Sequence, residues 1–227
     1  MPFFYAIICV TFLGGNMKKY LTLTIMLIFP ILLIGCQQDH GFNIEYDIDL
    51  DYEEYLSEQN PLIKMSIQDY GDIYIELFPE VAPITVDNFI AYIESESYVG
   101  STFHRVINNF MIQGGIVSDT ACAITGEFTA NGVVNRLSHY PGVIAMARTG
   151  FPNSATSQFF INEVYNSFLN SDYAAFGGVV SGFTIVEQIS DVKTNVVDQP
   201  NDDVIISSIE IDYRGYEPNE RICHANA

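Results

Sequence analysis

Short runs in which apolar and polar residues alternate, separated by Gly, Asn and Ser, are the feature that most restricts how this chain can fold. Residues 61–68 and 72–77 alternate in this way on either side of Asp69-Tyr70-Gly71. Two such runs joined by a short turn predict a β-hairpin. Further runs of the same kind lie at 102–106, 110–113, 142–147, 158–161, 175–180 and 204–213. We therefore expect a mainly β fold.

Two segments have the residue spacing of an amphipathic helix. Apolar residues recur at helical spacing from Val86 to Ile93, behind Pro83, which predicts a helix that runs to about Ser95. A second, shorter helix fits residues 184–190. Closing the sheet on itself is one way for many short strands to lose their exposed edges. The pattern alone therefore predicts a β-barrel with two helices.

The start of the chain has the organisation of an export signal. From Met17 it reads Lys18-Lys19, then an apolar run over about 21–34, then Leu-Ile-Gly-Cys ending at Cys36. A basic region, an apolar region of this length and a small residue before the cut predict a signal peptide over residues 1–35. The last four residues resemble the lipobox of bacterial lipoproteins, which implies a diacylglyceryl group on Cys36. A transmembrane helix is the alternative, but it needs about 20 apolar residues.

The first sixteen residues form a further apolar stretch ahead of the two lysines. A signal peptide begins with its basic region, so this stretch has no function in one. We interpret residues 1–16 as upstream sequence and Met17 as the true start.

Acidic residues crowd the segment between the lipidation site and the first strand. Such a run repels itself, so we expect residues 36–60 to form an extended, flexible tether. Asp47, Asp49, Asp51 and Glu58 also match the first, third, fifth and twelfth positions of a calcium-binding EF-hand loop. Tyr52 stands where that loop needs Gly, and no flanking helices are evident. A solvated spacer is the favoured interpretation.

The net charge and the spacing of Cys and His argue against nucleic-acid binding, membrane-surface binding and a metal site. Nine Lys plus Arg against 28 Asp plus Glu give a net charge of −19, which repels nucleic acid and an anionic membrane surface alike. The four Cys form no Cys-x-x-Cys pair and the four His share no ligand-like spacing, so we expect no metal site and no cofactor. A disulfide between Cys122 and Cys223 stays open, because it requires Cα atoms within about 7 Å.

Two long strings carry a family resemblance. They are FHRVINNFMIQGG, residues 103–115, and GVIAMARTGFPNSATSQFFIN, residues 142–162, and Phe176-Gly177 continues the match. They resemble the active site of the cyclophilin family of peptidyl-prolyl cis/trans isomerases, and the resemblance extends over about 62–211. It implies an eight-stranded closed antiparallel β-barrel capped by two α-helices. It also implies one isomerase domain over 61–214, followed by a C-terminal tail over 215–227.

The resemblance assigns roles to particular residues. Arg105 matches the catalytic residue, and its guanidinium stays charged and presents N–H groups in a rigid fork. Gln113 follows Met111 on the same face of a strand, where it can hold the substrate or Arg105 itself. The neighbouring His104 should face the other way, into the core. Substrate binding is implied for Phe110, Met111, Gln113, Ala147, Arg148, Thr149, Gln158, Phe160, Phe168, Leu169 and Tyr173.

Three of these positions depart from the common family pattern. Arg148 stands where the family more often has Asn, Phe168 where animal members have Trp and Tyr173 where they have His. These changes are familiar in bacterial relatives, so we expect activity to survive them. Weak binding of the inhibitor cyclosporin is expected, because the Trp N–H donor is absent.

The resulting functional hypothesis is an isomerase for X-Pro bonds in proline-containing polypeptides. We expect it to help exported proteins fold at the bacterial cell envelope, as a monomer outside the cytoplasm that contacts the membrane through its lipid alone. A binding module or chaperone with weak turnover is the alternative, but the retention of Arg105, Phe110, Met111, Gln113 and Phe160 favours turnover. A solute-binding lipoprotein would explain the anchor but not the two strings.

Overall fold

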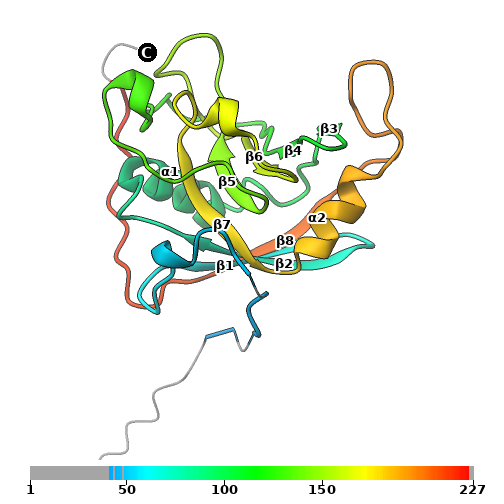
Figure 1. Cartoon of the computed structure of the whole chain (residues 1–227), viewed down its shortest axis with the longest axis horizontal. Helices are drawn as coiled ribbons and strands as arrows, with labels where there is room; N and C mark the ends of the chain where they lie inside the picture. The colour runs from blue at the N-terminus through cyan, green and yellow to red at the C-terminus, as the bar shows by residue number, and fades with distance from the viewer. Residues whose placement is uncertain (1–40, 43, 48, 225–227) are drawn as a thin grey trace, which may run out of the picture. The chain divides into compact units, whose positions relative to one another are not determined.

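The computed structural model describes residues 41–224 apart from 43 and 48. The predicted signal peptide, the start at Met17 and the lipidation site Cys36 lie outside these residues. The described chain forms one antiparallel sheet of eight strands with two α-helices, α1 (Pro83–Glu94) and α2 (Phe183–Ser190) (Figure 1). The strands are β1 (Leu62–Ile67), β2 (Gly71–Leu77), β3 (Arg105–Ile107), β4 (Met111–Gly114), β5 (Val143–Met146), β6 (Phe159–Asn162), β7 (Ala175–Ser181) and β8 (Ile206–Asp212).

The predicted mainly β fold with two helices is therefore confirmed, while the closed barrel is not. The strand order is β3-β4-β6-β5-β7-β2-β1-β8, so β3 and β8 end the sheet and share no ladder. The segment before β3 meets the start of β8 through the bridge between Thr102 and Ile205 and the hydrogen bond from Phe103 N to Val204 O, 2.9 Å. The sheet is curled but open, because the chain has no regular strand geometry ahead of Arg105.

The enclosed core follows from the alternation predicted along the strands. On β1, Ile63, Met65 and Ile67 are buried against the interior, while Lys64 and Ser66 between them are partly exposed. The apolar stripes of α1 and α2 join the same core and cover the sheet interior, which is the packing expected of amphipathic helices. Within the described residues, no helix is long and apolar enough to cross a bilayer.

A second apolar cluster covers the outer face of the central strands. We call it the outer-face cluster, and its buried members are Tyr52, Phe78, Met111, Leu137, Val143, Ala145, Phe160, Leu169 and Ala175. Because of it, every residue of β5 and β6 is buried, on both faces of the sheet. The outer-face cluster contributes to two features: it includes residues of the candidate site, and a segment that precedes β1 packs on it.

That segment differs from the predicted flexible tether. Residues 49–60, here called the N-terminal strap, include the short 3₁₀ helix Glu53–Tyr55 and pack on the outer-face cluster. Tyr52 is 1% exposed, and its hydroxyl donates to Val179 O at 2.5 Å. A Cβ atom at Gly178 would collide with the Tyr52 ring. Leu50, Tyr55 and Leu56 are partly buried beside Tyr52, so the repulsion between the acids does not keep the strap extended.

A buried carboxylate fastens the strap to the sheet. Glu76 of β2 is 0% exposed and accepts hydrogen bonds from the backbone N–H of Ser57 at 2.7 Å and from Asn60 Nδ2 at 2.9 Å. The Tyr46 hydroxyl donates to its other oxygen at 2.6 Å, and Arg214 forms an ion pair with it at 3.2 Å. Buried charges need such partners, so Glu76 joins the strap and the segment after β8 to one point.

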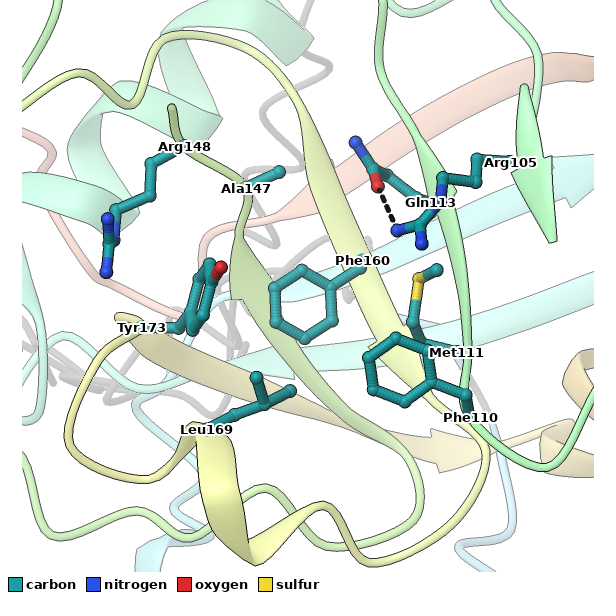
Figure 2. Close-up of a pocket in the computed structure, with 9 residues that line it drawn as sticks. All are labelled: Arg105, Phe110, Met111, Gln113, Ala147, Arg148, Phe160, Leu169 and Tyr173. Atoms are coloured by element: carbon teal, nitrogen blue, oxygen red, sulfur yellow. Dashed lines mark hydrogen bonds between the residues drawn. The ribbon is translucent and has the colours of Figure 1, made fainter. Parts of the chain in front are cut away.

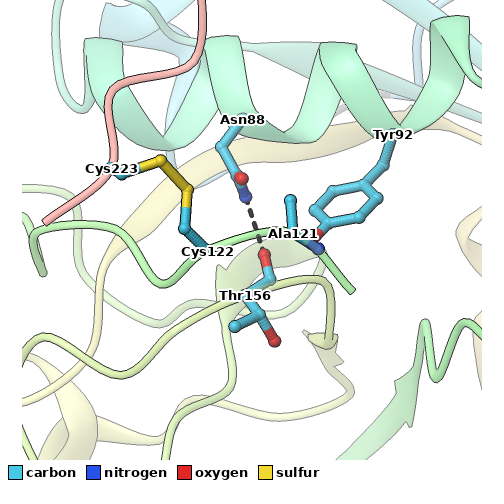
Figure 3. Close-up of a disulfide and its surroundings, with 6 residues drawn as sticks. All are labelled: Asn88, Tyr92, Ala121, Cys122, Thr156 and Cys223. Atoms are coloured by element: carbon cyan, nitrogen blue, oxygen red, sulfur yellow. Dashed lines mark hydrogen bonds between the residues drawn. A yellow bond between two sulfur atoms is a disulfide. The ribbon is translucent and has the colours of Figure 1, made fainter. Parts of the chain in front are cut away.

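The C-terminal tail is also attached to the domain. Cys122 and Cys223 form a disulfide with Cα atoms 5.6 Å apart, which answers the question that the sequence left open (Figure 3). The Tyr216 hydroxyl donates to Asp87 of α1 at 2.6 Å, and the guanidinium of Arg221 lies 4.2 Å from the centre of the Tyr92 ring. Residues 215–224 therefore run along α1 and hold it.

Candidate active site

A row of four residues crosses the outer face of the sheet. The registers pair Arg105 of β3 with Gln113 of β4, Gln113 with Phe160 of β6, and Phe160 with Ala145 of β5. Their neighbours along the strands, including Val106, are in the enclosed core. Because side chains alternate between the two faces of a sheet, the row lies on the outer face.

An apolar slot opens beside this row. It is a cavity of about 150 Å³ whose lining is Arg105, Phe110, Met111, Gln113, Ala147, Arg148, Phe160, Leu169 and Tyr173 (Figure 2). All nine are residues that the sequence analysis named. Two arginines line the slot on opposite sides of Phe160, Arg105 beside Gln113 and Arg148 beside Tyr173, and most of the other lining side chains are apolar. Such a site suits a small apolar ring with a polar group beside it.

Arg105 is held in place by amide side chains. Its Nη1 donates to Gln113 Oε1 at 3.4 Å, and Gln113 Nε2 donates to Gln158 Oε1 at 3.0 Å. Gln158 does not line the slot, and it reaches Arg105 through Gln113; its substrate-binding role stays a prediction. Gln113 holds Arg105, which is one of the two roles expected for it. The guanidinium is therefore partly fixed before any ligand binds.

Arg148 lines the slot but its head group points away from the apolar floor. Its guanidinium lies between two rings, 4.7 Å from the centre of Tyr173 and 5.0 Å from that of Phe128. Its Nε donates to Asp172 O at 2.9 Å. Tyr173 in turn meets Phe160 edge to face, with ring centres 5.6 Å apart. Arg148 therefore supports Tyr173, and its predicted role in substrate binding stays a prediction.

Two further predicted residues lie outside the slot. Thr149 is exposed, and its hydroxyl donates to Ser154 Oγ at 2.8 Å, which shapes the turn after β5. Phe168 is 68% exposed and stacks on Phe110 with ring centres 5.7 Å apart. Phe168 thus extends the apolar surface beyond the rim of the slot, while Thr149 does not reach it.

Two histidines flank the site, and burial lowers the pKa of each. His139 was not predicted; it is 0% exposed, stacks on Phe160 with ring centres 5.9 Å apart, and burial lowers its pKa to about 4. His104 was expected in the core, but it is half-buried, because the core positions of this segment are Phe103 and Val106. Burial lowers the pKa of His104, and the positive charge of Arg105 adds to the effect.

The described part of the chain contains no group of three or more His, Cys, Asp or Glu side chains arranged to hold a metal ion.

Comparisons with known proteins give concordant results. The family model described as "Cyclophilin type peptidyl-prolyl cis-trans isomerase/CLD" matches residues 62–211. A peptidyl-prolyl cis-trans isomerase of Acinetobacter baylyi is 41% identical over 162 residues, which are 67% of this chain and 86% of the relative. Peptidyl-prolyl cis-trans isomerase B of Escherichia coli is 43% identical over 155 residues, 63% of this chain and 94% of the relative.

Solved structures have the same fold. A cyclophilin-type peptidyl-prolyl cis-trans isomerase from Cryptosporidium parvum is similar with a TM-score of 0.61 and 28% identity, over 67% of this chain and 98% of that one. A second structure of the same protein, determined in the presence of the dipeptide Ala-Pro, is similar with a TM-score of 0.59.

Proposed function

This chain belongs to the cyclophilin-type family of peptidyl-prolyl cis-trans isomerases, and from that premise we propose that the slot binds the proline ring of an X-Pro segment and that Arg105 catalyses rotation about the bond. The structure of a similar protein in the presence of Ala-Pro supports proline-containing peptides as the class of ligand. The observation that carries the proposal is the guanidinium of Arg105, held by Gln113 at the edge of an apolar slot.

The reaction needs a donor more than an acid or a base. Rotation about an amide loses resonance, with a barrier of about 18–20 kcal/mol, and no bond is broken. As the bond twists, the proline nitrogen becomes pyramidal and gains a lone pair. A fixed N–H aimed at that nitrogen stabilises the twisted state more than either planar state. Each 1.4 kcal/mol or so of such stabilisation is worth about tenfold in rate.

The apolar floor supplies the other requirement. Met111, Phe160 and Leu169 are buried in the outer-face cluster and offer a ring-sized surface without competing donors. A proline ring placed there has its nitrogen near the polar edge formed by Arg105 and Gln113. The free energy of burying the ring would then hold the substrate while the adjoining bond rotates.

The deciding experiment measures the cis/trans exchange rate of a short X-Pro peptide with the full chain, beside its Arg105→Ala variant. We expect kcat/KM to fall by at least about tenfold, because the donor for the twisted bond is removed. Arg136→Ala is the matched control, since it removes the same charge from an exposed position outside the slot.

Catalysis by a well-folded parent and its loss in Arg105→Ala alone would support the assignment. No catalysis by the folded parent, or equal rates for the parent and Arg105→Ala, would contradict it. Binding of the peptide without catalysis would instead support the alternative function, a module that binds proline-containing segments.

We also propose that the protein assists the folding of exported proteins at the bacterial cell envelope, as a lipid-anchored monomer outside the cytoplasm. The supporting features are the basic and apolar leader and the Leu-Ile-Gly-Cys ending at Cys36. A disulfide between Cys122 and Cys223 agrees with an oxidising compartment outside the cytoplasm. Slow X-Pro isomerisation limits the folding of many chains, so such a compartment has substrates for the enzyme.

Lipid attachment is tested by growing cells on a labelled fatty acid and comparing the chain with its Cys36→Ser variant. We expect label and membrane association in the parent, and neither in the variant. Label in both proteins would count against Cys36 as the anchor. A parent recovered unlabelled with residues 1–16 intact would count against the anchor and against the start at Met17.

A further inference from the structure

The loop between α2 and β8 forms a small, self-supporting unit. Thr194 bridges to Pro200, and the backbone N–H of Asn195 donates to Gln199 O at 2.8 Å. The side-chain oxygen of Asn195 accepts hydrogen bonds from the N–H groups of Val197 at 3.0 Å and of Gln199 at 3.2 Å. The loop, residues 194–200, therefore has a fixed shape that does not depend on packing against a core.

Asp198 joins this loop to the strand that carries Arg105. Its carbonyl accepts a hydrogen bond from the N–H of Val106 at 2.8 Å. Its φ of 64° lies in the left-handed region, which Asp and Asn tolerate better than most residues. In this arrangement Asp198 Oδ2 lies 3.6 Å from Arg105 Nε. The loop thus brings a carboxylate to the side of the guanidinium that Gln113 does not contact.

The two contacts on Arg105 use different nitrogens. Asp198 faces Nε and Gln113 accepts from Nη1, and neither contact uses Nη2. A guanidinium is planar, so holding two of its nitrogens fixes the direction of the third. The N–H groups of Nη2 are then aimed by the protein before the substrate binds. Preorganised donors of this kind stabilise a transition state without the cost of reordering.

We propose that Asp198 is a positioning residue for the isomerase reaction, acting through Arg105 on the twisted X-Pro bond. This inference rests on the proposed catalytic role of Arg105. Both side chains are partly exposed, 41% for Arg105 and 44% for Asp198, so the pair has the strength of a surface ion pair rather than a buried one. We expect the loss of Asp198 to lower kcat by about threefold to fivefold, far less than the loss of Arg105.

The test compares Asp198→Asn with the matched control Asp202→Asn. Asn keeps the shape of the side chain and accepts the same backbone conformation, so Asp198→Asn should fold like the parent. Asp202 is exposed on the same connection, and its substitution removes the same charge. Exchange spectroscopy on a short X-Pro peptide yields kcat and KM separately, and the ¹H–¹⁵N signal of Arg105 Nε reports on the guanidinium itself.

The inference predicts a lower kcat with KM within about twofold, and a shifted Arg105 Nε signal, in Asp198→Asn but not in Asp202→Asn. Equal kcat in Asp198→Asn and the parent would overturn it, as would an equal fall in both variants, or a fall that leaves the Arg105 signal unmoved. If Arg105→Ala keeps the parental rate, the proposed function of Arg105 fails instead, whatever Asp198 does.

Discussion

Among single residues, His139 shows how an apolar site can depend on an uncharged ring. It is 0% exposed beneath Phe160, and the side chain of Asn170 contacts its Nδ1 at 3.2 Å. Burial lowers the pKa of His139 from 6.5 to about 4. The folded protein therefore keeps this ring neutral at a pH at which an unfolded chain would protonate it.

We expect this histidine to weaken the fold in mild acid. Below pH 6.5 the unfolded state binds a proton that the folded state excludes until about pH 4, so stability falls as the pH falls through this window. The loss is about 2 kcal/mol at pH 5. Urea unfolding at pH 7 and pH 5 should show it in the parent, and His139→Asn should lose that much less. Equal pH dependence in both proteins would contradict the assignment.

We expect Arg148 to affect substrate affinity through its neighbour Tyr173. Replacing Arg148 by Ala removes the cation between the Tyr173 and Phe128 rings, and one such contact is worth about 0.5–1 kcal/mol. We expect KM to rise about threefold with kcat little changed. Peptide kinetics beside Arg136→Ala provide the measurement and its control. A fall in kcat as large as that of Arg105→Ala would mean that Arg148 contacts the reacting bond.

Residues at positions that match the family were predictable even where distant segments bring them together, while residues outside those positions were not. Arg105 and Gln113 follow from the family strings and from alternation along two strands. Asp198 and His139 reach the site from distant segments, and no local spacing predicts such contacts. The orientation of Arg148 depends on Phe128, which no motif named.

Among the secondary-structure elements, the N-terminal strap contributes to stability through one side chain. Tyr52→Ala would leave a cavity beside Gly142 and Gly178, and we expect it to cost about 3–5 kcal/mol in the free energy of unfolding. Denaturant unfolding measures this loss. Glu53→Ala, at an exposed position next to Tyr52, is the control and should change little. If Tyr52→Ala were as stable as the parent, the strap would be the free tether that its charges suggest.

The disulfide attaches the C-terminal tail to the domain. It joins residues separated by 101 positions, and closing so long a loop typically stabilises a fold by about 2–4 kcal/mol. We expect the double variant Cys122→Ser, Cys223→Ser to lose that much stability while keeping its isomerase activity, because the bond lies outside the slot. A thiol reductant should weaken the parent and leave the variant unchanged. A parent insensitive to reduction would contradict this.

The strands and helices were predictable because each has a regular spacing of apolar residues. The N-terminal strap and the C-terminal tail have no such spacing. Alternation and helical spacing mark the regular elements to within a few residues. In the strap, acidic residues outnumber the apolar ones, and Tyr52 is buried because Gly142 and Gly178 leave room for its side chain. These two glycines meet Tyr52 only once the sheet has formed, so no local sequence pattern predicts the contact.

At the scale of the whole molecule, the net charge of −19 should make the enzyme act faster on basic substrate chains than on acidic ones. An acidic surface raises the local concentration of basic chains and repels acidic ones. We expect kcat/KM to be at least about twofold higher for X-Pro peptides with lysines several residues from the proline than for peptides with glutamates there. The difference should shrink as salt rises from 10 mM to about 1 M, because the Debye length shortens. A preference independent of salt would point to direct contacts instead.

Under the proposed lipid anchor, the contact between Tyr46 and Glu76 would limit how far the domain can lie from a membrane. With the proposed anchor at Cys36, a free chain up to Asn60 could span roughly 80 Å, but Tyr46 is already fastened to Glu76, which leaves roughly 35 Å of leash. The volume within reach falls with the cube of that length, to roughly a tenth. If the chain is lipidated at Cys36 as proposed, we expect it to act close to the membrane surface, on polypeptides that have just crossed the membrane rather than on those that have diffused away.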